Sequence, residues 1–380
     1  MKVVEIISDT NVGGAGRLLL TRLKNSNREG IDRSVILPRG SKLEGHFADI
    51  GVTVHTVDGC RDRSFDIGAI VKLVRILREI SPDIVNCHGA LSARIAAAYL
   101  RIPVRIYTRH CTYPVPLPLR LFPIKQLLGG VGRALSPHAI AVAHAAQKDM
   151  MLMGYPEDNI KVIINGVEGF QKYGEAERTA ARRELGVEDK FVVGICARVE
   201  KCKDHDCFLR AARILSQEDD RYRFIVVGEG SLLAETMALA DSLGIADKVI
   251  FTGFVGDVER YMNCFDLNVN CSVGTETSSL ALSEGMSIGL PAVASSYGGN
   301  PYMVRHGENG FIYSMGDFCE LADMIRRLAQ DSSLYERASR VAYRRFLSEL
   351  NAKNMTEQTE DYYLELYSDH LGNAAREVGC

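Results

Sequence analysis

Residues 3–17 read Val-Val-Glu-Ile-Ile-Ser-Asp-Thr-Asn-Val-Gly-Gly-Ala-Gly-Arg, an apolar run followed directly by a glycine-rich turn. A short apolar run that ends at a turn is typical of a buried strand. Similar runs recur along the chain, and amphipathic helical patterns separate them. Buried strands that alternate with helices indicate a parallel sheet covered on both faces. The chain is therefore predicted to be an α/β protein.

The predicted strands form two groups. The first group comprises residues 3–7, 34–37, 52–57, 84–87, 104–108 and 140–143. The second group comprises residues 191–197, 224–227, 249–251, 267–270 and 292–294. The alternation pauses between Glu168 and Lys190, where the chain is charged and follows the turn signal Asn165-Gly166. We therefore expect two doubly wound domains, at 1–168 and 187–350, which bind ligands beyond the carboxyl ends of their strands.

Two helical segments carry apolar residues at helical spacing. After Asp66, Ile67, Ile70, Val71, Val74 and Leu77 fall on one expected buried face. The segment 355–380 is expected to form a helix that completes the first domain. Its expected apolar anchors are Tyr362, Leu366 and Leu371.

Composition limits the class of protein. The chain has 380 residues, of which 46% are hydrophobic and 24% are charged, and its net charge is −3. These values are those of a folded protein and argue against a nucleic-acid partner. The first strand takes the place of a secretory signal, and no uncharged apolar run reaches ~18 residues. The ten cysteines form no Cys-x-x-Cys pair, so we expect a cytoplasmic protein.

Two carboxylates in the second half are spaced as a ligand-binding pair. Glu276 and Glu284 are separated by seven residues and follow a predicted strand. Eight residues of helix rise about 12 Å, roughly the length of a sugar–diphosphate–ribose axis. The free N–H groups near Ser279, Leu280 and Ala281 would then face the diphosphate. Alone, the pattern is more typical of two surface carboxylates on an ordinary helix.

Basic residues and glycines follow other strands of the second half. Arg198 and Lys203 come after the strand 191–197, where a diphosphate would lie. The planar fork of arginine and the point charge of lysine both suit phosphate oxygens. Gly228 and Gly230 form another strand-to-helix turn at the same edge of the predicted sheet.

The first half offers a comparable turn. Without side chains at Gly13 and Gly14, backbone can approach a ligand closely. The Gly-x-Gly-x-x-Gly spacing of a dinucleotide site is not met, and no acidic residue clearly ends the second strand. A nicotinamide cofactor is therefore not expected.

Asp204-His205-Asp206 spells Asp-x-Asp, a pattern that can hold a divalent metal. Here it opens an amphipathic helix, where helix capping and the helix dipole explain the two acids. We expect no metal and no cofactor.

The individual motifs gain weight from their order. They run Gly13-Gly14-Ala15-Gly16-Arg17, Thr108-Arg109-His110, Asn165-Gly166-Val167, Arg198 to Lys203, Gly228-Glu229-Gly230, Phe251-Thr252-Gly253-Phe254, Glu276-x7-Glu284 and Gly298-Gly299-Asn300-Pro301. This order resembles the retaining family 4 glycosyltransferases. The resemblance covers nearly the whole chain, and it implies the GT-B architecture of two Rossmann-like domains. The donor nucleotide is then held mainly by the second domain.

The resemblance implies a role for each matching residue of the second half. Glu284 would bind the ribose hydroxyls, and Glu276 would bind the hydroxyls of the donor sugar. Arg198 and Lys203 would neutralise the departing diphosphate. Phe254 belongs to the donor-binding set together with the glycines named above.

Roles in the first half follow in the same way. Gly14 would bring backbone to the phosphates, and His110 would lie near the reacting carbon of the sugar. His88, after the strand 84–87, and Arg17 are candidates for the acceptor side. His110 also fits a loop histidine that caps a helix.

The chain departs from the family pattern at three places. Thr277-Ser278-Ser279 stands where the family often has Gly-Phe-Gly, Asp204 replaces a frequent glycine, and Tyr302 stands where a glutamate is common. These changes affect the expected sugar more than the expected nucleotide.

Residues 113–135 are apolar and lightly basic. They suit contact with a bilayer or a lipid-linked acceptor, and they equally suit a helix buried between domains.

The expected activity is transfer of a hexosyl or N-acetylhexosaminyl group from a nucleotide-sugar donor, UDP-sugar above all. The expected acceptor is a glycan, a lipid-linked molecule or a small molecule. Front-face substitution with retention is the expected mechanism. A nucleotide-sugar epimerase of the same fold, or a non-catalytic nucleotide-sugar-binding protein, remain alternatives.

Overall fold

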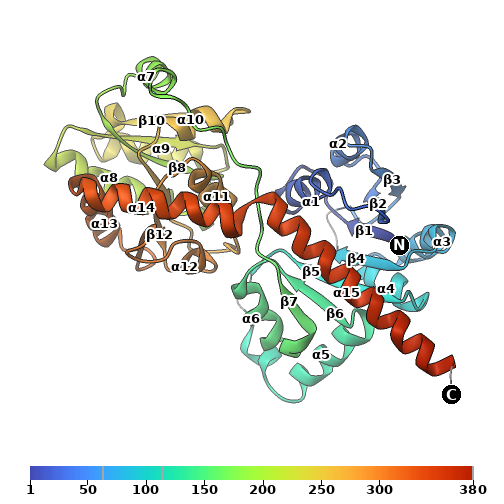
Figure 1. Ribbon diagram of the computed structural model, residues 1–380. Coiled ribbons are helices and arrows are strands. Elements are labelled where there is room, and N and C mark those ends of the chain that lie inside the picture. The colour runs from blue at the N-terminus through green and yellow to red at the C-terminus, as the bar shows by residue number, and fades with distance from the viewer. Residues whose placement is uncertain (62–63, 113–114, 379–380) are drawn as a thin grey trace. The chain divides into compact units, whose positions relative to one another are not determined.

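A computed structural model describes residues 1–61, 64–112 and 115–378 of the chain. The chain divides into two compact units (Figure 1). Unit 1 comprises Met1–Gly166 and Ala352–Cys380, and unit 2 comprises Val167–Asn351. Residues 379–380, which belong to the predicted C-terminal helix, lie outside the described residues.

In unit 1, the described strands form a parallel sheet in the order β3-β2-β1-β4-β5-β6-β7. The strands are β1 Lys2–Ile7, β2 Asp32–Pro38, β3 Thr53–Val57, β4 Ile84–His88, β5 Val104–Arg109, β6 His138–Ala141 and β7 Ile160–Val162. The strand order reverses between β1 and β4, which is where ligands of doubly wound sheets bind.

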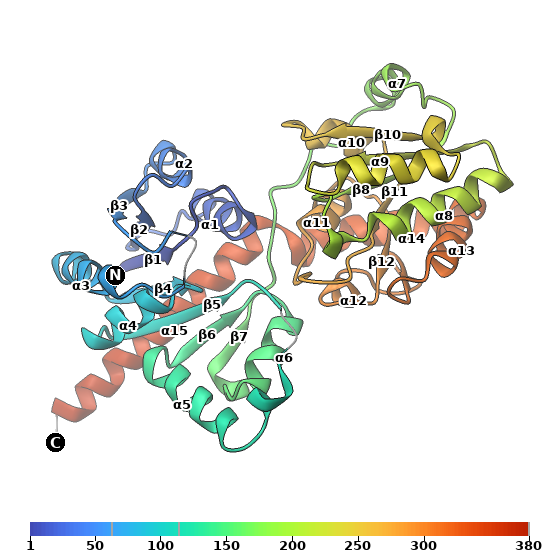
Figure 2. The same cartoon turned by 180° about the vertical axis from the view of Figure 1, so that it is seen from behind.

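Helices connect these strands, and α15 returns to the unit after the chain has passed through unit 2. The α-helices of unit 1 are α1 Gly14–Lys24, α2 Leu43–Asp49, α3 Ile67–Ile80, α4 Leu91–Tyr99, α5 Ile124–Leu135, α6 His144–Leu152 and α15 Ala352–Val378. Two 3-10 helices are η1 Leu117–Arg120 and η2 Glu157–Asn159. Helix α15 runs along the unit in both views and contacts α1 (Figure 2).

In unit 2, the described strands form a second parallel sheet, in the order β10-β9-β8-β11-β12-β13. The strands are β8 Phe191–Cys196, β9 Tyr222–Val227, β10 Val249–Gly253, β11 Leu267–Asn270, β12 Ala292–Ser295 and β13 Gly310–Tyr313. Here the order reverses between β8 and β11. The predicted architecture of two doubly wound, Rossmann-like sheets is confirmed.

The helices of unit 2 lie on both sides of this sheet (Figure 2). They are α7 Glu175–Glu184, α8 His205–Glu218, α9 Leu233–Ser242, α10 Val258–Cys264, α11 Leu280–Ser287, α12 Asn300–Met303, α13 Phe318–Gln330 and α14 Ser332–Arg345. Shorter turns are η3 Lys201–Lys203, η4 Ala246–Lys248 and the π-helical η5 Phe346–Leu350. Buried Phe208 and Leu215 of α8 join Phe224 and Val226 of β9 in the core.

Two predicted apolar faces differ from the observed ones. In α3 the buried residues are Ala69, Leu73 and Leu77, whereas Ile67 is 70% exposed and Val71 is 67% exposed. The apolar stripe of this helix is wider than its contact with the sheet, so its far edge stays in solvent. In α15 Tyr362 and Leu366 are buried as predicted, but Leu371 is exposed, because it lies beyond the last contacts of the helix.

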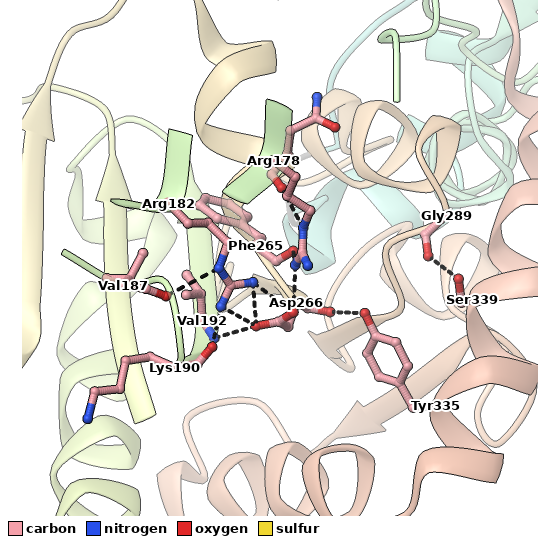
Figure 3. A network of polar contacts seen from close by, with 11 residues as sticks. Arg178, Arg182, Val187, Lys190, Val192, Phe265, Asp266, Gly289, Tyr335 and Ser339 are labelled. Atoms are coloured by element: carbon pink, nitrogen blue, oxygen red, sulfur yellow. Dashed lines mark hydrogen bonds and ion pairs between the residues drawn. The ribbon is translucent and has the colours of Figure 1, made fainter. Parts of the chain in front are cut away.

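The charged segment after Val167 contains α7, which packs against the rest of unit 2 (Figure 3). Asp266 accepts hydrogen bonds from Arg178 Nη2 at 2.6 Å, from Arg182 Nη1 at 3.1 Å and from the Val192 amide at 2.7 Å. The Tyr335 hydroxyl donates to the Asp266 carbonyl at 2.9 Å. These contacts lie at the amino end of β8 and β11, so the opposite, carboxyl end of the sheet is where the predicted site residues lie.

Candidate functional site

Glu276 lies in the loop after β11 and is buried. Its Oε2 atom accepts a hydrogen bond from Lys203 Nζ at 2.6 Å and from the Ser272 hydroxyl at 2.8 Å. The Asn270 side-chain amide donates to the same oxygen at 3.1 Å. Three donors from β11, its following loop and η3 therefore hold this carboxylate in place.

Asn270 organises the loop around Glu276. Its Oδ1 atom accepts from the Ser272 amide at 3.0 Å and from Asn300 Nδ2 at 3.2 Å. Its Nδ2 atom also donates to the Ser279 hydroxyl at 3.0 Å. One buried amide thus ties together the start of α11, the loop after β11 and the start of α12.

The glycine pair before α12 makes room for this loop. A Cβ atom at Gly298 would lie 1.9 Å from the Glu276 carbonyl oxygen, and one at Gly299 would lie 1.8 Å from the Thr277 carbonyl oxygen. Gly298 also has a φ of 60°, which favours glycine. The Gly299 amide donates to the Glu276 carbonyl at 3.2 Å. The Gly-Gly motif therefore positions the backbone of Glu276.

Helix α11 begins at Leu280, after Glu276. Glu276 is therefore in a loop, and its distance from Glu284 is not set by the rise of one helix; Thr275, with a φ of 54°, turns the chain there. The Ser279 hydroxyl caps α11 by accepting from the Leu282 amide at 3.3 Å. Glu284 lies within α11 and is 8% exposed.

Arg198 and Lys203 follow β8, as predicted. Arg198 is exposed, whereas the Lys203 side chain is 18% exposed and forms the ion pair with Glu276. Gly228 and Gly230 allow the loop after β9 to lie against this segment. Their Cβ atoms would lie 2.0 Å from the Ala197 carbonyl oxygen and 2.2 Å from the Val199 carbonyl oxygen. These two glycines therefore shape the loop that carries Arg198.

Phe254 follows β10 and is 79% exposed. Such exposure is unusual for a large aromatic ring and leaves its face available for stacking.

Asp204-His205-Asp206 opens α8, as predicted. Asp204 Oδ1 accepts from the Cys207 amide at 3.3 Å, and Asp206 forms an ion pair with Arg210 on the same helix. Burial raises the pKa of Asp204. Over residues 1–61, 64–112 and 115–378, no group of three His, Cys, Asp or Glu side chains is placed to hold a metal ion.

In unit 1, the exposed turn before α1 carries Gly13 and Gly14. Gly13 is the N-cap of α1, and the first turn of this helix contains no acidic residue. A Cβ atom at Gly14 would have no neighbour within 4 Å among the described residues. Arg17 follows on the same helix and is exposed. The Asp9 carboxylate lies beside this turn, with its Oδ2 atom 3.7 Å from the position of a Cβ atom at Gly13, so the N-terminus of α1 already has an anion next to it.

His88 and His110 lie at the ends of β4 and β5 and contact each other. His88 Nδ1 is 2.7 Å from His110 Nε2, and the two rings stack with centroids 5.0 Å apart. The other ring nitrogen of His88, Nε2, is 2.8 Å from Glu5 Oε2. A chain of three side chains therefore runs from β1 through β4 to the loop after β5.

Glu5 is buried in the centre of the sheet and has several partners. Arg22 of α1 forms an ion pair with it, and the Tyr363 hydroxyl of α15 donates to Glu5 Oε1 at 2.9 Å. Burial alone would raise the pKa of Glu5. The charge of Arg22 and the hydrogen bond with His88 outweigh burial and lower this pKa to about 2. Glu5 is therefore ionised at neutral pH.

His110 is neutral for a related reason. Burial above all, together with the charge of nearby Arg22, holds its pKa well below the usual range of histidine. Its Nδ1 atom is buried without a hydrogen-bond partner in the part of the chain that the structure describes. The ring lines a cavity of about 30 Å³, which has room for a water molecule.

Several residues of the two sites were not predicted from the sequence. Glu5 contacts His88, and Asn270 and Ser272 contact Glu276. Arg22 and Asn300 lie one step further away, because Arg22 contacts Glu5 and Asn300 contacts Asn270. A signal was present in two of them. Glu5 interrupts the apolar run Val-Val-Glu-Ile-Ile, and Asn270 ends the strand Leu-Asn-Val-Asn, where a polar side chain needs a buried partner.

The segment predicted to contact either a bilayer or the second domain begins with Tyr113 and Pro114, which lie outside the described residues. The remainder forms η1 and α5. Its apolar side chains are largely exposed, among them Leu117, Leu121, Phe122, Ile124, Leu127, Leu128 and Val131. No helix among the described residues is long and apolar enough to cross a membrane.

Two family models match the chain, Glycosyltransferase Family 4 over residues 12–168 and Glycosyl transferases group 1 over residues 190–331. The putative glycosyltransferase EpsD of Bacillus subtilis is 26% identical over 305 residues, which is 77% of this chain and 79% of that protein. The N-acetyl-alpha-D-glucosaminyl L-malate synthase of Bacillus anthracis is 25% identical over 331 residues, or 84% of each chain.

Among solved structures, Anabaena Alr3699/HepE in complex with UDP matches with a TM-score of 0.82. The match covers 96% of this chain and 100% of that one, at 21% identity. This likeness shows the fold, which is GT-B.

Proposed function

Because the chain belongs to the retaining family 4 glycosyltransferases, also called glycosyl transferases group 1, it is a glycosyltransferase, and we propose the following donor and acceptor. The donor is a UDP-sugar that carries a hexosyl or N-acetylhexosaminyl group. The acceptor is a glycan, a lipid-linked molecule or a small molecule of bacterial cell-surface glycan synthesis. HepE structures that hold UDP and UDP-glucose support UDP, and a relative named for capsular polysaccharide biosynthesis supports the pathway class.

One observation carries the assignment of the donor site. Lys203 Nζ and Glu276 Oε2 are 2.6 Å apart, in a loop where Asn270 also donates to Glu276. A cation and an anion that pair at the carboxyl end of a sheet can exchange partners with a ligand that carries both phosphates and hydroxyls. Lys203, together with Arg198, would bind the diphosphate. Glu276 would accept from hydroxyls of the sugar.

Other residues would hold the rest of the donor. Glu284 would accept from the ribose hydroxyls, and the exposed ring of Phe254 would stack on the base. The amides of Leu280 and Ala281, in the first turn of α11, would donate to the phosphates. In unit 1, the N-terminus of α1 at Gly13 and Gly14 would do the same once the Asp9 carboxylate beside it turns away.

Front-face substitution accounts for retention without a protein nucleophile. The bond between the anomeric carbon and the diphosphate oxygen breaks, and the electron pair stays on that oxygen. The acceptor oxygen bonds to the same face of the carbon, and its proton passes to the departing oxygen. Arg198 and Lys203 would stabilise the negative charge that develops on the diphosphate. His110 would contact a hydroxyl of the sugar.

Two alternatives make different predictions. A nucleotide-sugar epimerase converts a donor without an acceptor, and a binding protein does not consume it. Membership in a transferase family favours transfer over both.

A panel of nucleotide sugars would test the proposal. A donor at 100 times its dissociation constant stabilises the protein by about 2.7 kcal/mol, which a thermal melt detects. Release of UDP should then depend on an added acceptor. Lys203→Ala should lower transfer by roughly 10- to 150-fold, the range expected for a lost hydrogen bond to a charged group. Exposed Lys201, in the same turn, is the matched control, and Lys201→Ala should leave transfer nearly unchanged.

If the protein converts the donor into another nucleotide sugar without an acceptor, the activity is epimerisation and not transfer. Equal losses in the two lysine variants would overturn the role of Lys203.

We also propose that the exposed face of η1 and α5 binds the surface of an anionic bilayer. Its exposed apolar side chains are accompanied by Arg120, Lys125 and Arg133, and residues 84–148 contain no Asp or Glu. Apolar side chains among basic ones suit the interface of an anionic membrane, where a lipid-linked acceptor would lie.

Sedimentation with phosphatidylcholine vesicles, with and without phosphatidylglycerol, would test this surface. The protein should sediment with the anionic vesicles, and a Leu121→Glu, Leu127→Glu variant should not. Ile67→Glu with Val71→Glu changes an equally exposed apolar pair of unit 1 and should still sediment. Lipid-free dimers that the Leu121, Leu127 variant abolishes would instead assign the surface to a second copy of the chain.

A further inference from the structure

We propose that Glu5 and His88 are positioning residues that hold His110 as a neutral imidazole protonated on Nε2. The Nδ1 atom of His110 is then a hydrogen-bond acceptor, suited to a hydroxyl of a bound sugar. The first statement concerns the protein alone. The second rests on the proposed function.

The proton on His88 follows from the state of Glu5. An ionised carboxylate only accepts hydrogen bonds, and both oxygens of Glu5 are in use. Oε1 faces Arg22 and the Tyr363 hydroxyl, and Oε2 lies 2.8 Å from His88 Nε2. His88 must therefore carry a proton on Nε2.

The charge of His88 follows from the balance of the buried cluster. Glu5 contributes one negative charge and Arg22 one positive charge, and both side chains are almost fully buried. A protonated His88 would add a second buried positive charge, and the other carboxylate that acts on Arg22, Glu360, already pairs with Arg33 and Arg28. His88 is therefore neutral, and its Nδ1 atom has a free lone pair.

The proton on His110 follows in turn. His88 Nδ1 and His110 Nε2 are 2.7 Å apart, and two acceptors would repel each other at that distance. His110 Nε2 must therefore carry the proton that joins them. A neutral imidazole has one proton, so His110 Nδ1 has none.

This tautomer suits the proposed reaction in two ways. His110 Nδ1 has no protein partner among the described residues, so its lone pair is available to a hydroxyl donor that displaces the nearby side chains or water. Positive charge also builds on the anomeric carbon as a glycosidic bond breaks. A neutral histidine does not oppose that charge, whereas an imidazolium would.

Tautomers can be measured directly in the full chain. Nitrogen-15 labelling of histidine and two-bond proton–nitrogen correlation spectra at pH 7 distinguish the two ring nitrogens, and His88→Gln and His110→Gln variants assign the signals. The proposal requires His110 to be protonated on Nε2 and unprotonated on Nδ1. A proton on Nδ1, or on both nitrogens, overturns it. This result does not depend on finding a donor or an acceptor.

Kinetics test the second statement. His88→Ala should release the tautomer of His110 and lower kcat by roughly 10- to 100-fold, the usual cost of losing a residue that orients a ligand-binding histidine. His88→Asn keeps an amide oxygen near the position of Nδ1, so it should keep the tautomer and restore part of the lost kcat. His46→Gln, which changes an exposed histidine of unit 1, should leave both unchanged.

A mixed tautomer with unchanged kcat would show that the relay does not serve catalysis. A lower kcat in His88→Ala with the tautomer retained would show that His88 acts in another way. If no nucleotide sugar supports transfer, the proposed function fails while the spectra still decide the tautomer.

Discussion

Each unit has an ion pair beside its parallel sheet, Glu5 with Arg22 in unit 1 and Glu276 with Lys203 in unit 2, but the surroundings of the two pairs differ. In unit 1, Glu5 and Arg22 are both buried, and the ring of His88 stands between that pair and His110 in the loop after β5. In unit 2, Lys203 and Glu276 pair with each other at a partly exposed position. Unit 1 thus buries both charges of its ion pair. In unit 2, a ligand can separate the two charges by binding to each of them.

The difference follows from what surrounds each pair. Glu5 lies in a central strand, and α1 and α15 cover it with Arg22 and Tyr363. Glu276 lies in a loop that neutral Asn270 and Ser272 support. A buried pair fixes structure, because separating it leaves an uncompensated charge. A pair at a loop can instead change partners at low cost.

The largest expected effect is on stability. Glu5→Gln leaves Arg22 buried without its anion and should lower the free energy of unfolding by about 3–5 kcal/mol. Urea unfolding measures this loss. Asp58→Asn removes an ion pair with Arg39 that lies on the surface of the same unit, so it should change stability little. Similar losses in the two variants would show that the buried pair is not structural.

The corresponding change in unit 2 sharpens the contrast. Glu276→Gln keeps the size of the side chain and removes its charge, but Lys203 can turn toward solvent. The loss of unfolding free energy should therefore be clearly smaller than for Glu5→Gln. A loss as large as that of Glu5→Gln would mean that both pairs have the same structural role.

Acid should weaken the pair in unit 1. The pKa of Glu5 is lowered from 4.5 to about 2, so the folded state holds this carboxylate ionised where the unfolded chain protonates it. Its contribution is present above pH 4.5 and is lost as the pH falls from 4.5 to about 2. At 1.36 kcal/mol for each pKa unit, the contribution is on the order of 3 kcal/mol.

A Glu5→Gln, Arg22→Met double variant removes the titrating group together with its partner. The difference in unfolding free energy between wild type and this variant should shrink between pH 5 and pH 2.5. A difference that stays constant over this range would contradict the low pKa of Glu5.

The smallest expected effect comes from the glycine that supports Glu276. Gly298→Ala places a side chain at a φ of 60° and against the Glu276 carbonyl, which should cost about 1–3 kcal/mol. Because the loop must move, transfer should fall by about tenfold or more while the unit still folds. Gly256→Ala, at a glycine of unit 2 with no described neighbour within 4 Å, is the control. If the rate of transfer is unchanged in Gly298→Ala, the position of Glu276 does not depend on Gly298.

Sequence patterns predicted the alternating elements well, because strands buried on both faces are continuously apolar. They missed β7 and β13, which are short, and misjudged α3, because periodicity shows where an apolar stripe lies but not how much of it is covered. Residues at the ends of strands, such as Arg198 and His88, could be predicted, since topology alone places each of them at the carboxyl edge of its own sheet.

Their partners could not be predicted from sequence. Glu5 meets Tyr363 only because α15 returns to unit 1 after unit 2, and Asn300 meets Asn270 only through the fold. The spacing of Glu276 and Glu284 could not be taken from helical rise, since the chain between them is a loop as far as Ser279. Contacts between segments far apart in the chain decide these details.

The most direct test of the donor site is calorimetric titration of UDP into wild type, Glu284→Ala and Glu276→Ala. Glu284→Ala should weaken UDP by roughly 10- to 150-fold, because the ribose loses a hydrogen bond to a charged group. Glu276→Ala should leave UDP affinity equal or higher, because Lys203 is released from its partner, while kcat with the UDP-sugar falls. If Glu276→Ala weakens UDP as severely as Glu284→Ala, the proposed division between sugar and ribose is contradicted.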